Sequence, residues 1–453
     1  RRPGPGFPVA ADLPPLPSPH MVPWPERAHH GNAERTLSKL YWILSRLARA
    51  LWVRVSAYAL LGILAAMFAS LGGRLLNGNV PVEVSTEAIE GLLTIIATSM
   101  LTVTSFSVGA LTSAYSSATS NATPRATPLL TEDQLVQNAL ATFVGSFLFS
   151  IVGIVALKVS VYGPEGRAIL FFVTLGVILL IVIALLRWIN QLTKLGRVRD
   201  TVDRIEEATD TSMRGRVDLP YLGGGPLGDE TRGAPVPSDT VGYVQFIDTD
   251  KLSAICEDLG AEIDVQVLPG VFVYQGSVLA RVAGQDEVGE EAAERIRDTF
   301  TIGLVRTIDQ DPRFGLVVLC EVAQRALSPG VNDPGTAIDV IGRQTRLLSY
   351  WGDAWEGADR VEPKYPRLRV PALDYHDMFE DAFNLIARDG AAQVEVVLRL
   401  TKALKALTTI GPEPSRAAAR RQLEVALTRA RAQLPIDDDH RRLDEALEMP
   451  RPG

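Results

Sequence analysis

The chain has 453 residues, of which 47% are hydrophobic and concentrated in the first half, so it is long enough for more than one domain. Its formal net charge of −8 at pH 7 argues against a nucleic-acid-binding protein, because such a protein carries a basic face. The two cysteines, Cys256 and Cys320, lie far apart in apolar stretches, and their spacing indicates neither a disulfide framework nor a zinc site.

The amino-terminal segment is rich in proline, with nine prolines by position 25. We expect residues 1–34 to be disordered or an upstream extension, and Met21 is a candidate start of the chain. Residues 35–54 interleave leucine and tryptophan with arginine and lysine, a pattern typical of an amphipathic helix at a membrane surface. This pattern makes the lipid bilayer the first expected partner of the chain.

Four stretches are long and uncharged enough to cross a membrane as helices. They are residues 55–73, 91–124, 134–157 and 168–186. Lysine and arginine are concentrated before the first stretch and after the fourth, which predicts that both termini are cytoplasmic. The sequence therefore predicts a four-helix transmembrane domain at residues 55–192.

The second stretch contains no ionisable side chain and is longer than a bilayer requires. As a helix it would reach roughly 50 Å, whereas the hydrocarbon core of a bilayer is about 30 Å thick. Its small polar residues recur at three- and four-residue steps and form one stripe along the helix, here called the hydroxyl stripe: Thr94, Thr98, Thr102, Ser105, Gly109, Thr112, Ser113, Ser116 and Ser120. A second row, here called the alanine row, consists of Ala110, Ala114, Ala118 and Ala122.

The hydroxyl stripe has two interpretations. In the first, its small residues and hydroxyls pack this helix against other helices. In the second, copies of the helix line a hydrated path, because hydroxyls offer water and ions neutral partners. A single protomer has too few neighbours to cover a helix that is small or polar on several sides, so we expect a homo-oligomer held through this helix. The four stretches contain no Asp, Glu, His, Lys or Arg, which favours a passive path over a pump.

The second half of the sequence predicts a cytoplasmic α+β domain. Residues 187–213 are expected to continue from the fourth stretch as a charged helix, so that residues 193–240 contain a helix and a Gly/Pro-rich linker. The glycine run in this linker follows no strand and does not fit a dinucleotide-binding loop. Residues 241–286 are expected to form a small β module with a strand at 241–247 and a short helix at 249–259. Residues 262–283 alternate apolar and polar side chains between turn signals, which predicts hairpins of a small β-barrel or sandwich. A helical bundle is expected at residues 287–434 and a polar tail at residues 435–453.

From residue 287 on, apolar residues at helical spacing predict six helices, with one brief strand among them. The helices are expected at residues 290–308, 315–326, 336–351, 376–388, 391–408 and 415–434, and the strand at 368–370. The turn-forming run at residues 328–335 contains an Asn and an Asp that can cap the following helix. The alternative is a ligand or interface site that this run forms with a nearby charged cluster. Its candidate residues are Asp309, Asp311, Arg313, Ser328, Asn332 and Asp333.

No catalytic motif is present in the sequence. It has no metalloprotease helix, nucleophile elbow or phosphate loop, and only His376 and His440 lie outside the amino-terminal region. We therefore expect a protein that is not an enzyme and that carries no metal and no cofactor.

Several runs resemble a known family. They are Asp309-Gln-Asp-Pro-Arg-Phe-Gly-Leu, Arg325-Ala-Leu-Ser-Pro-Gly-Val-Asn-Asp-Pro-Gly-Thr-Ala, Thr123-Pro-Arg and the later Asp133-Gln with Gln137-Asn. Over roughly residues 40–434 the chain resembles the bacterial predicted membrane protein family catalogued as domain of unknown function 2254. The resemblance implies a multi-pass protein of the bacterial inner membrane with four spans and a cytoplasmic domain. It implies no established activity and assigns no functional residue.

The expected fold is an α-helical membrane domain of four transmembrane helices, one of them very long, joined to a cytoplasmic α+β domain. The expected function is a homo-oligomeric channel or channel-like pore, lined by the hydroxyl stripe and regulated by the cytoplasmic domain. The alternative is a non-conducting membrane scaffold or sensor whose cytoplasmic domain binds a protein or a small molecule.

Overall fold

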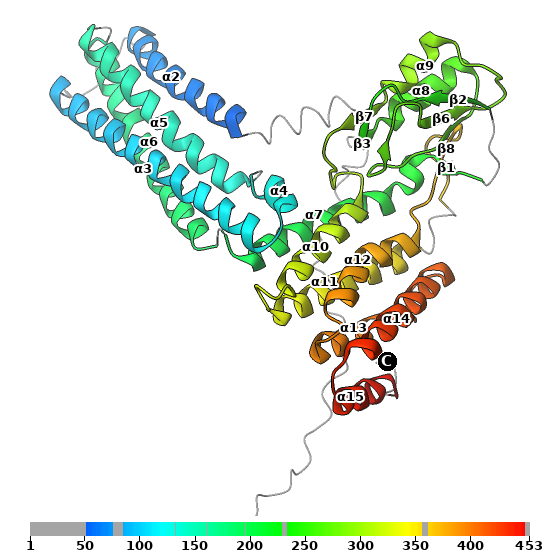
Figure 1. The fold of residues 1–453 in the computed structure, drawn as a ribbon. Coiled ribbons are helices and arrows are strands. Elements are labelled where there is room, and N and C mark those ends of the chain that lie inside the picture. Colours follow the sequence, from blue (N-terminus) through cyan, green and yellow to red (C-terminus); the bar gives the residue numbers. More distant parts are fainter. Residues whose placement is uncertain are drawn as a thin grey trace, which may run out of the picture.

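The computed structural model describes residues 51–75, 85–131, 133–160, 162–194, 196–228, 233–355 and 361–448. The proline-rich segment 1–34 and nearly all of the interfacial helix predicted at residues 35–54 lie outside these ranges. Figure 1 shows a bundle of long helices on the left, a group of helices in the middle, and two small sheets at the upper right. We call the first part the apolar bundle, the second the helical core, and the third the β module.

The apolar bundle consists of four long helices with short connecting turns. Its elements are α2 (Leu51–Leu75), α3 (Thr86–Asn121), η2 (Pro124–Ala126), α4 (Thr127–Thr131), α5 (Gln134–Lys158) and α6 (Pro164–Leu192). Three of them, α3, α5 and α6, are long and apolar enough to cross a membrane, as the sequence predicted. The span predicted at residues 55–73 is helical within α2. Within α2 the described apolar stretch Val53–Leu64 is shorter than a bilayer requires, so a fourth span stays a prediction.

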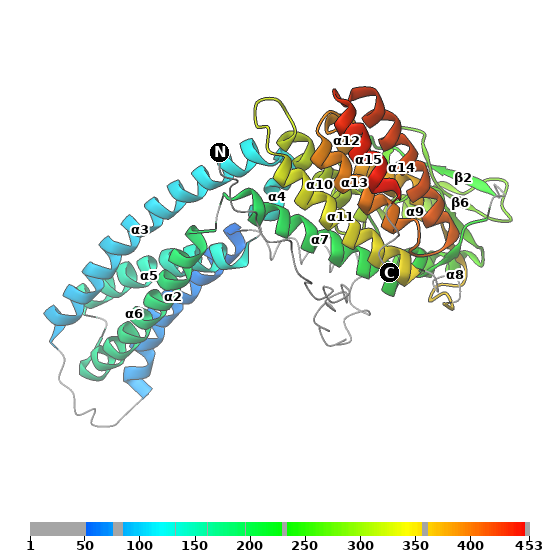
Figure 2. The same ribbon diagram turned by 90° about the horizontal axis from the view of Figure 1, so that it is seen from below.

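Helix α3 has 36 residues and so measures roughly 54 Å. It begins where Ser85 caps it, because the Ser85 hydroxyl accepts a hydrogen bond of 3.2 Å from the backbone N–H of Ala88. It ends before Pro124, which cannot continue the helix because proline has no N–H and its ring would clash with the carbonyl four residues earlier. In Figure 2, α3 runs along α5 and α6 and then continues past them to α4 and α10.

Glycines allow α2 and α5 to cross with their backbones in contact. A Cβ atom at Gly62 would lie 2.5 Å from the carbonyl oxygen of Gly145. A Cβ atom at Gly145 would in turn lie 2.8 Å from the carbonyl oxygen of Tyr58. Such small-residue crossings are a common way for membrane helices to approach each other. The position of α2 in the bundle therefore depends on these two glycines.

The second half alternates helices and short strands. Its first elements are α7 (Val198–Asp218), η3 (Pro220–Gly223), β1 (Gly225–Pro226), β2 (Ala234–Pro237), β3 (Gly242–Ile247), α8 (Thr249–Leu259), β4 (Ile263–Val265), β5 (Phe272–Val273), β6 (Val278–Val282), α9 (Glu290–Arg297) and β7 (Phe300–Gly303). The remaining elements are α10 (Pro312–Ala326), α11 (Pro334–Trp355), β8 (Leu368–Val370), α12 (Tyr375–Asp389), α13 (Val394–Leu407), α14 (Glu413–Gln433) and α15 (Asp437–Glu448). The bounds predicted for α8 and β8 are confirmed, and those of α10 to α14 agree within a few residues.

The β module contains two open sheets around one hydrophobic core. The strand order is β1-β8-β4-β6-β2 in one sheet and β5-β3-β7 in the other. Within residues 262–283, where hairpins were predicted, β4 and β6 form an antiparallel pair, whereas β5 between them pairs with β3 of the other sheet. In the described part of the chain neither sheet closes into a barrel. Buried residues of both sheets, among them Val244, Ile263 and Leu368, share one apolar cluster.

Three other expectations also differ from the structure. The helix predicted at residues 290–308 ends at Arg297, because the following residues form β7, which pairs with β3 and completes the smaller sheet. The tail predicted at residues 435–453 contains helix α15, which buries Leu443 and Ala446. The charged helix predicted to continue from the last apolar stretch is interrupted between α6 and α7. Gly196 has a φ of +80° at this interruption, a conformation that favours glycine.

The helical core is a hydrophobic cluster shared by α7 and α10 to α14. It also contains a buried ion network between α7 and α11. Glu206, which is 6% exposed, accepts a hydrogen bond of 2.6 Å from Arg343 and another of 2.6 Å from Arg346. Arg343 is equally buried and also pairs with Asp203 and Asp339. These contacts join α7, which leads out of the apolar bundle, to the centre of the second half.

Candidate functional site

The hydroxyl stripe lies on the outside of the protomer. All nine of its residues are exposed, from Thr94 to Ser120. The opposite side of α3 is packed against the rest of the bundle, where Leu93 and Met100 are buried in apolar clusters with residues of α5 and α6. A Cβ atom added at Gly109 would meet no described atom within 4 Å. The described residues of one protomer therefore leave the whole stripe uncovered.

The hydroxyls of the stripe bond to their own helix. Thr98, Thr102, Ser105 and Thr112 each donate to the carbonyl oxygen four residues earlier, at distances of 2.9, 2.9, 3.0 and 2.9 Å. Ser120 donates in the same manner to Ser117, three residues earlier, at 3.0 Å. These bonds satisfy the hydroxyl protons without any partner outside the helix. These five hydroxyls can therefore face an apolar or a wet surrounding without an unpaired donor.

Large apolar side chains lie on both sides of the hydroxyl stripe. Ile95 and Phe106 are 65% and 66% exposed along one flank, and Leu101 and Val108 are exposed along the other. Such a band of exposed apolar residues requires lipid or another protein surface to cover it.

The alanine row packs against other parts of the same protomer. Ala118 and Ala122 are buried, and Ala110 and Ala114 are half-buried. A Cβ atom at Gly196, in the turn between α6 and α7, would lie 3.5 Å from the Cα atom of Ala114. The small side chains of this row therefore let the chain pass close to α3 where it enters α7.

The tip of α3 is attached to the helical core through Glu321 of α10. The hydroxyl of Thr123 donates a hydrogen bond of 2.9 Å to Glu321, and Arg125 forms an ion pair with the same carboxylate. Ala122 and Ala126 belong to the hydrophobic cluster of the helical core. The longest helix of the bundle therefore ends in direct contact with the second half, as Figure 2 shows.

A cavity of about 1380 Å³, here called the junction cavity, lies where α3 meets the helical core. It is lined by the tip of α3, the end of α10, the loop at residues 328–332 and the end of α12. Two predicted site residues, Ser328 and Asn332, line this cavity. It brings together two runs singled out in the sequence, Thr123-Pro-Arg and the loop after Arg325.

The loop between α10 and α11 has the capping role expected from its sequence. The Asp333 carboxylate accepts hydrogen bonds from the backbone N–H of Thr336 at 3.1 Å and from its hydroxyl at 2.6 Å. Asn332 has a φ of +50°, which asparagine tolerates better than most residues. The Ser328 hydroxyl donates to the carbonyl oxygen of Arg325 at 2.6 Å. Asp333 therefore acts as a helix cap.

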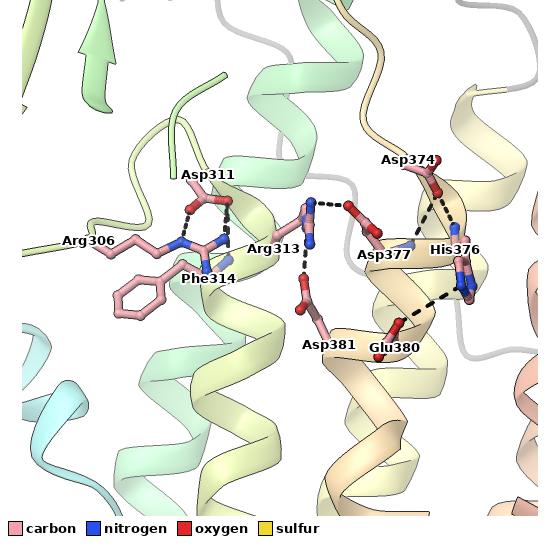
Figure 3. A network of polar contacts seen from close by, with 9 residues as sticks. All are labelled: Arg306, Asp311, Arg313, Phe314, Asp374, His376, Asp377, Glu380 and Asp381. Atoms are coloured by element: carbon pink, nitrogen blue, oxygen red, sulfur yellow. Dashed lines mark hydrogen bonds and ion pairs between the residues drawn. The ribbon is translucent and has the colours of Figure 1, made fainter. Parts of the chain in front are cut away.

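Two other predicted site residues, Asp311 and Arg313, belong to the polar network drawn in Figure 3. Asp311 caps α10 and accepts two hydrogen bonds from Arg306, at 2.6 and 3.2 Å. Arg313 pairs with Asp377 at 2.6 Å and with Asp381 at 2.7 Å, both on α12. Burial raises the pKa of the Asp311 carboxyl, and the Arg306 guanidinium opposes this shift. These pairs join α10 to α12 and to the segment that follows β7.

The two predicted groups do not form one site. The network around Asp311 and Arg313 lies at the start of α10, whereas Ser328 and Asn332 follow its end. The 15 residues of α10 separate the two groups by roughly 21 Å. Asp309 is exposed, and its backbone carbonyl accepts a hydrogen bond of 3.3 Å from Ser212. In the described residues, no group of three or more His, Cys, Asp and Glu side chains is arranged to hold a metal ion.

A sequence model of the family described as predicted membrane protein, domain of unknown function 2254, matches residues 48–406. The chain belongs to this family. The family description and the three long apolar helices of the described residues place the protein in a membrane.

Curated relatives of this member of the predicted membrane protein family occur in mycobacteria. An uncharacterized protein of Mycobacterium bovis and one of Mycobacterium tuberculosis are each 26% identical over 324 residues, which cover 67% of this chain. The aligned region spans 60% of the length of these relatives. No solved structure matches the chain.

Sequence reasoning on this family member missed three residues that line the junction cavity. They are Glu321 and Gln324 of α10 and Arg388 of α12. Arg125 and Arg325 were visible in the runs that carry the family resemblance, but nothing in the sequence indicates that they share a cavity. Arg216 was also missed, because a charged residue in an apparently solvated helix gives no signal of burial. It is 4% exposed, and burial lowers the pKa of its guanidinium to about 10 while Asp311 opposes the shift.

Proposed function

We propose that this protein is a homo-oligomeric channel or channel-like pore of the bacterial inner membrane, in which copies of α3 surround a hydrated path. The observation that supports it most is the exposure of the hydroxyl stripe along the length of α3, opposite the packed side of that helix. Charged groups do not interrupt the stripe, and hydroxyls can solvate water or ions at low cost. The flanking Ile95, Leu101, Phe106 and Val108 would pack between neighbouring copies.

In this proposal the helical core and the β module form a cytoplasmic domain that regulates the pore. The attachment of Thr123 and Arg125 to Glu321 supports a mechanical connection between this domain and α3. The excess of lysine and arginine at both ends of the apolar bundle supports cytoplasmic termini.

Cysteine labelling tests the hydrated path. Single cysteines replacing Thr98, Thr102 or Ser105 should react with a small aqueous thiol reagent in reconstituted vesicles, because water reaches the stripe in the pore. A cysteine replacing Leu179 is the matched control, since Leu179 of α6 is 61% exposed in the protomer but lies outside the stripe, where lipid would cover it. The native cysteines are both buried, so unsubstituted protein gives the background.

The outcomes separate the pore from the scaffold. Equal labelling of the stripe and of Leu179→Cys would contradict the hydrated path, as would a protein that is monomeric by light scattering. Replacing Ser105 by leucine should reduce solute flux by about tenfold or more while the oligomer persists, because an apolar constriction excludes water. Unchanged flux in this variant would favour the non-conducting scaffold or sensor.

A separate labelling experiment tests the topology. A cysteine at Gly163, in the exposed connection between α5 and α6, should react with a membrane-impermeant reagent added to intact cells. A cysteine at Asp239, which is exposed in the β module, should react only after the membrane is permeabilised. Labelling of the Asp239 variant in intact cells would contradict a cytoplasmic second half.

A further inference from the structure

We infer that the junction cavity is a binding site for an anionic phosphate-bearing group, held by Arg325 together with Arg125 and Arg388. This inference concerns a different part of the molecule from the hydroxyl stripe and holds whether or not the protein conducts. The volume of the junction cavity, about 1380 Å³, exceeds the roughly 300–1,000 Å³ of common small-molecule sites, so a phosphorylated ligand has room to enter.

The charges that line the cavity leave one cation unmatched. Arg125 is paired with Glu321, and Arg388 is paired with Asp389 through two hydrogen bonds of 2.6 and 3.0 Å. These two pairs use both carboxylates of the lining. Among the described residues no side chain forms a hydrogen bond or ion pair with the Arg325 guanidinium. The lining therefore carries a net positive charge centred on Arg325.

One amide oxygen of a half-buried side chain in the cavity lining also lacks a partner. The Oε1 atom of Gln393 is inaccessible to solvent and has no hydrogen-bond partner among the described residues. Buried polar atoms of side chains are usually paired, so an unpaired one in a cavity wall indicates a missing partner. Because the Gln393 side chain is only half-buried, a turn of its amide can bring either the oxygen or the NH₂ group to the cavity, where it can accept from a ligand hydroxyl or donate to a phosphate oxygen.

The cations that line the cavity are arginines, which favours a phosphate group over a single-atom anion as the ligand. Guanidinium groups form paired hydrogen bonds to two oxygens of one phosphate, a geometry that lysine does not provide. The Arg125 side chain is 57% exposed in its pair with Glu321. Exposed ion pairs contribute little stability, so Arg125 can turn from Glu321 toward a bound phosphate at small cost.

The phosphate can belong to a soluble molecule or to a lipid headgroup. Both sources are possible by position, because η2 and α4 connect the tip of α3 at the cavity directly to the start of α5 in the apolar bundle. The chemistry that recognises them is the same, so the test uses one arm for each source.

The test uses the full chain in lipid nanodiscs. In the first arm the discs contain only neutral phosphatidylcholine, and sodium pyrophosphate is titrated by calorimetry at an ionic strength held constant with KCl. In the second arm no soluble phosphate is added. The thermal unfolding midpoint is compared between discs of phosphatidylcholine alone and discs in which about 30% of the lipid is the anionic phosphatidylglycerol. Each arm compares the unsubstituted protein with Arg325→Gln and with Arg399→Gln. Arg399 is an exposed arginine of α13 outside the cavity, so its replacement changes the net charge equally.

We expect Arg325→Gln to weaken pyrophosphate binding by about tenfold or more, or to abolish the stabilisation by phosphatidylglycerol, because it removes charge-assisted hydrogen bonds. Arg399→Gln should behave like the unsubstituted protein in both arms. A response in the first arm identifies a soluble ligand, and a response in the second alone identifies a lipid headgroup. The inference is overturned if neither arm responds in the unsubstituted protein, or if both variants reduce the response equally.

Discussion

Replacing Gly145 by leucine should separate α2 from α5 and destabilise the apolar bundle by at least about 3 kcal/mol, the upper end of the cost of overpacking a core. The cause is a backbone contact, since a Cβ atom at this position would lie 2.8 Å from the carbonyl oxygen of Tyr58. A carbonyl oxygen in a helix cannot turn away as a side chain can, so the whole of α2 must move. The thermal unfolding midpoint of the detergent-solubilised protein measures the effect.

The matched control for this substitution is Gly176→Leu in α6. A Cβ atom at Gly176 would meet no described atom within 4 Å, so the added side chain points into open space. This control receives the same apolar residue in a neighbouring helix and should keep the unfolding midpoint of the unsubstituted protein. Equal midpoints for the two variants would show that α2 and α5 do not cross at Gly62 and Gly145.

Replacing Glu206 by alanine should destabilise the helical core by about 3 kcal/mol, because it leaves buried guanidinium groups without their shared carboxylate. Arg343 loses a hydrogen bond of 2.6 Å but keeps Asp203 and Asp339, so the expected loss is at the lower end for a broken buried pair. A change of this size should lower the unfolding midpoint by roughly 6–12 °C in a domain of 150–250 residues.

Glu413→Ala provides the control for Glu206→Ala. Glu413 of α14 also pairs with two arginines, Arg416 and Arg420, but its side chain is 63% exposed. Water replaces these partners when the carboxylate is removed, so this variant should unfold at the same temperature as the unsubstituted protein. If the Glu206 variant unfolds at that temperature as well, the buried network contributes nothing to stability.

The sequence was informative wherever the signal is local. Uncharged length identified α3, α5 and α6, and the apolar spacing of residues 315–326 identified α10 within three residues of its observed start. Asp333 was recognised as a cap because a cap and the N–H that it accepts from lie within three positions. The three- and four-residue spacing of the small polar residues was also enough to predict that they share one face of α3.

Contacts between distant parts of the chain could not be predicted from the sequence. The strands β5 and β6 follow each other across a turn, yet β5 pairs with β3 and β6 with β4 and β2, and the two sheets bury side chains in one shared core. Thr123 meets Glu321 across 198 positions, and no local pattern encodes that meeting. The junction cavity, which the ends of α3 and α10 line together, therefore could not be predicted from the sequence.

The hydrogen bonds along α3 give the hydroxyl stripe an electrical character that its neutral composition conceals. A hydroxyl has one proton and two lone pairs, and at Thr98, Thr102, Ser105 and Thr112 the proton is already committed to a backbone carbonyl. Each of these oxygens therefore presents only lone pairs to whatever lies beside it. In the pore that we propose, a ring of such surfaces would attract positive charge and repel negative charge, so a path between copies of α3 would favour cations over anions.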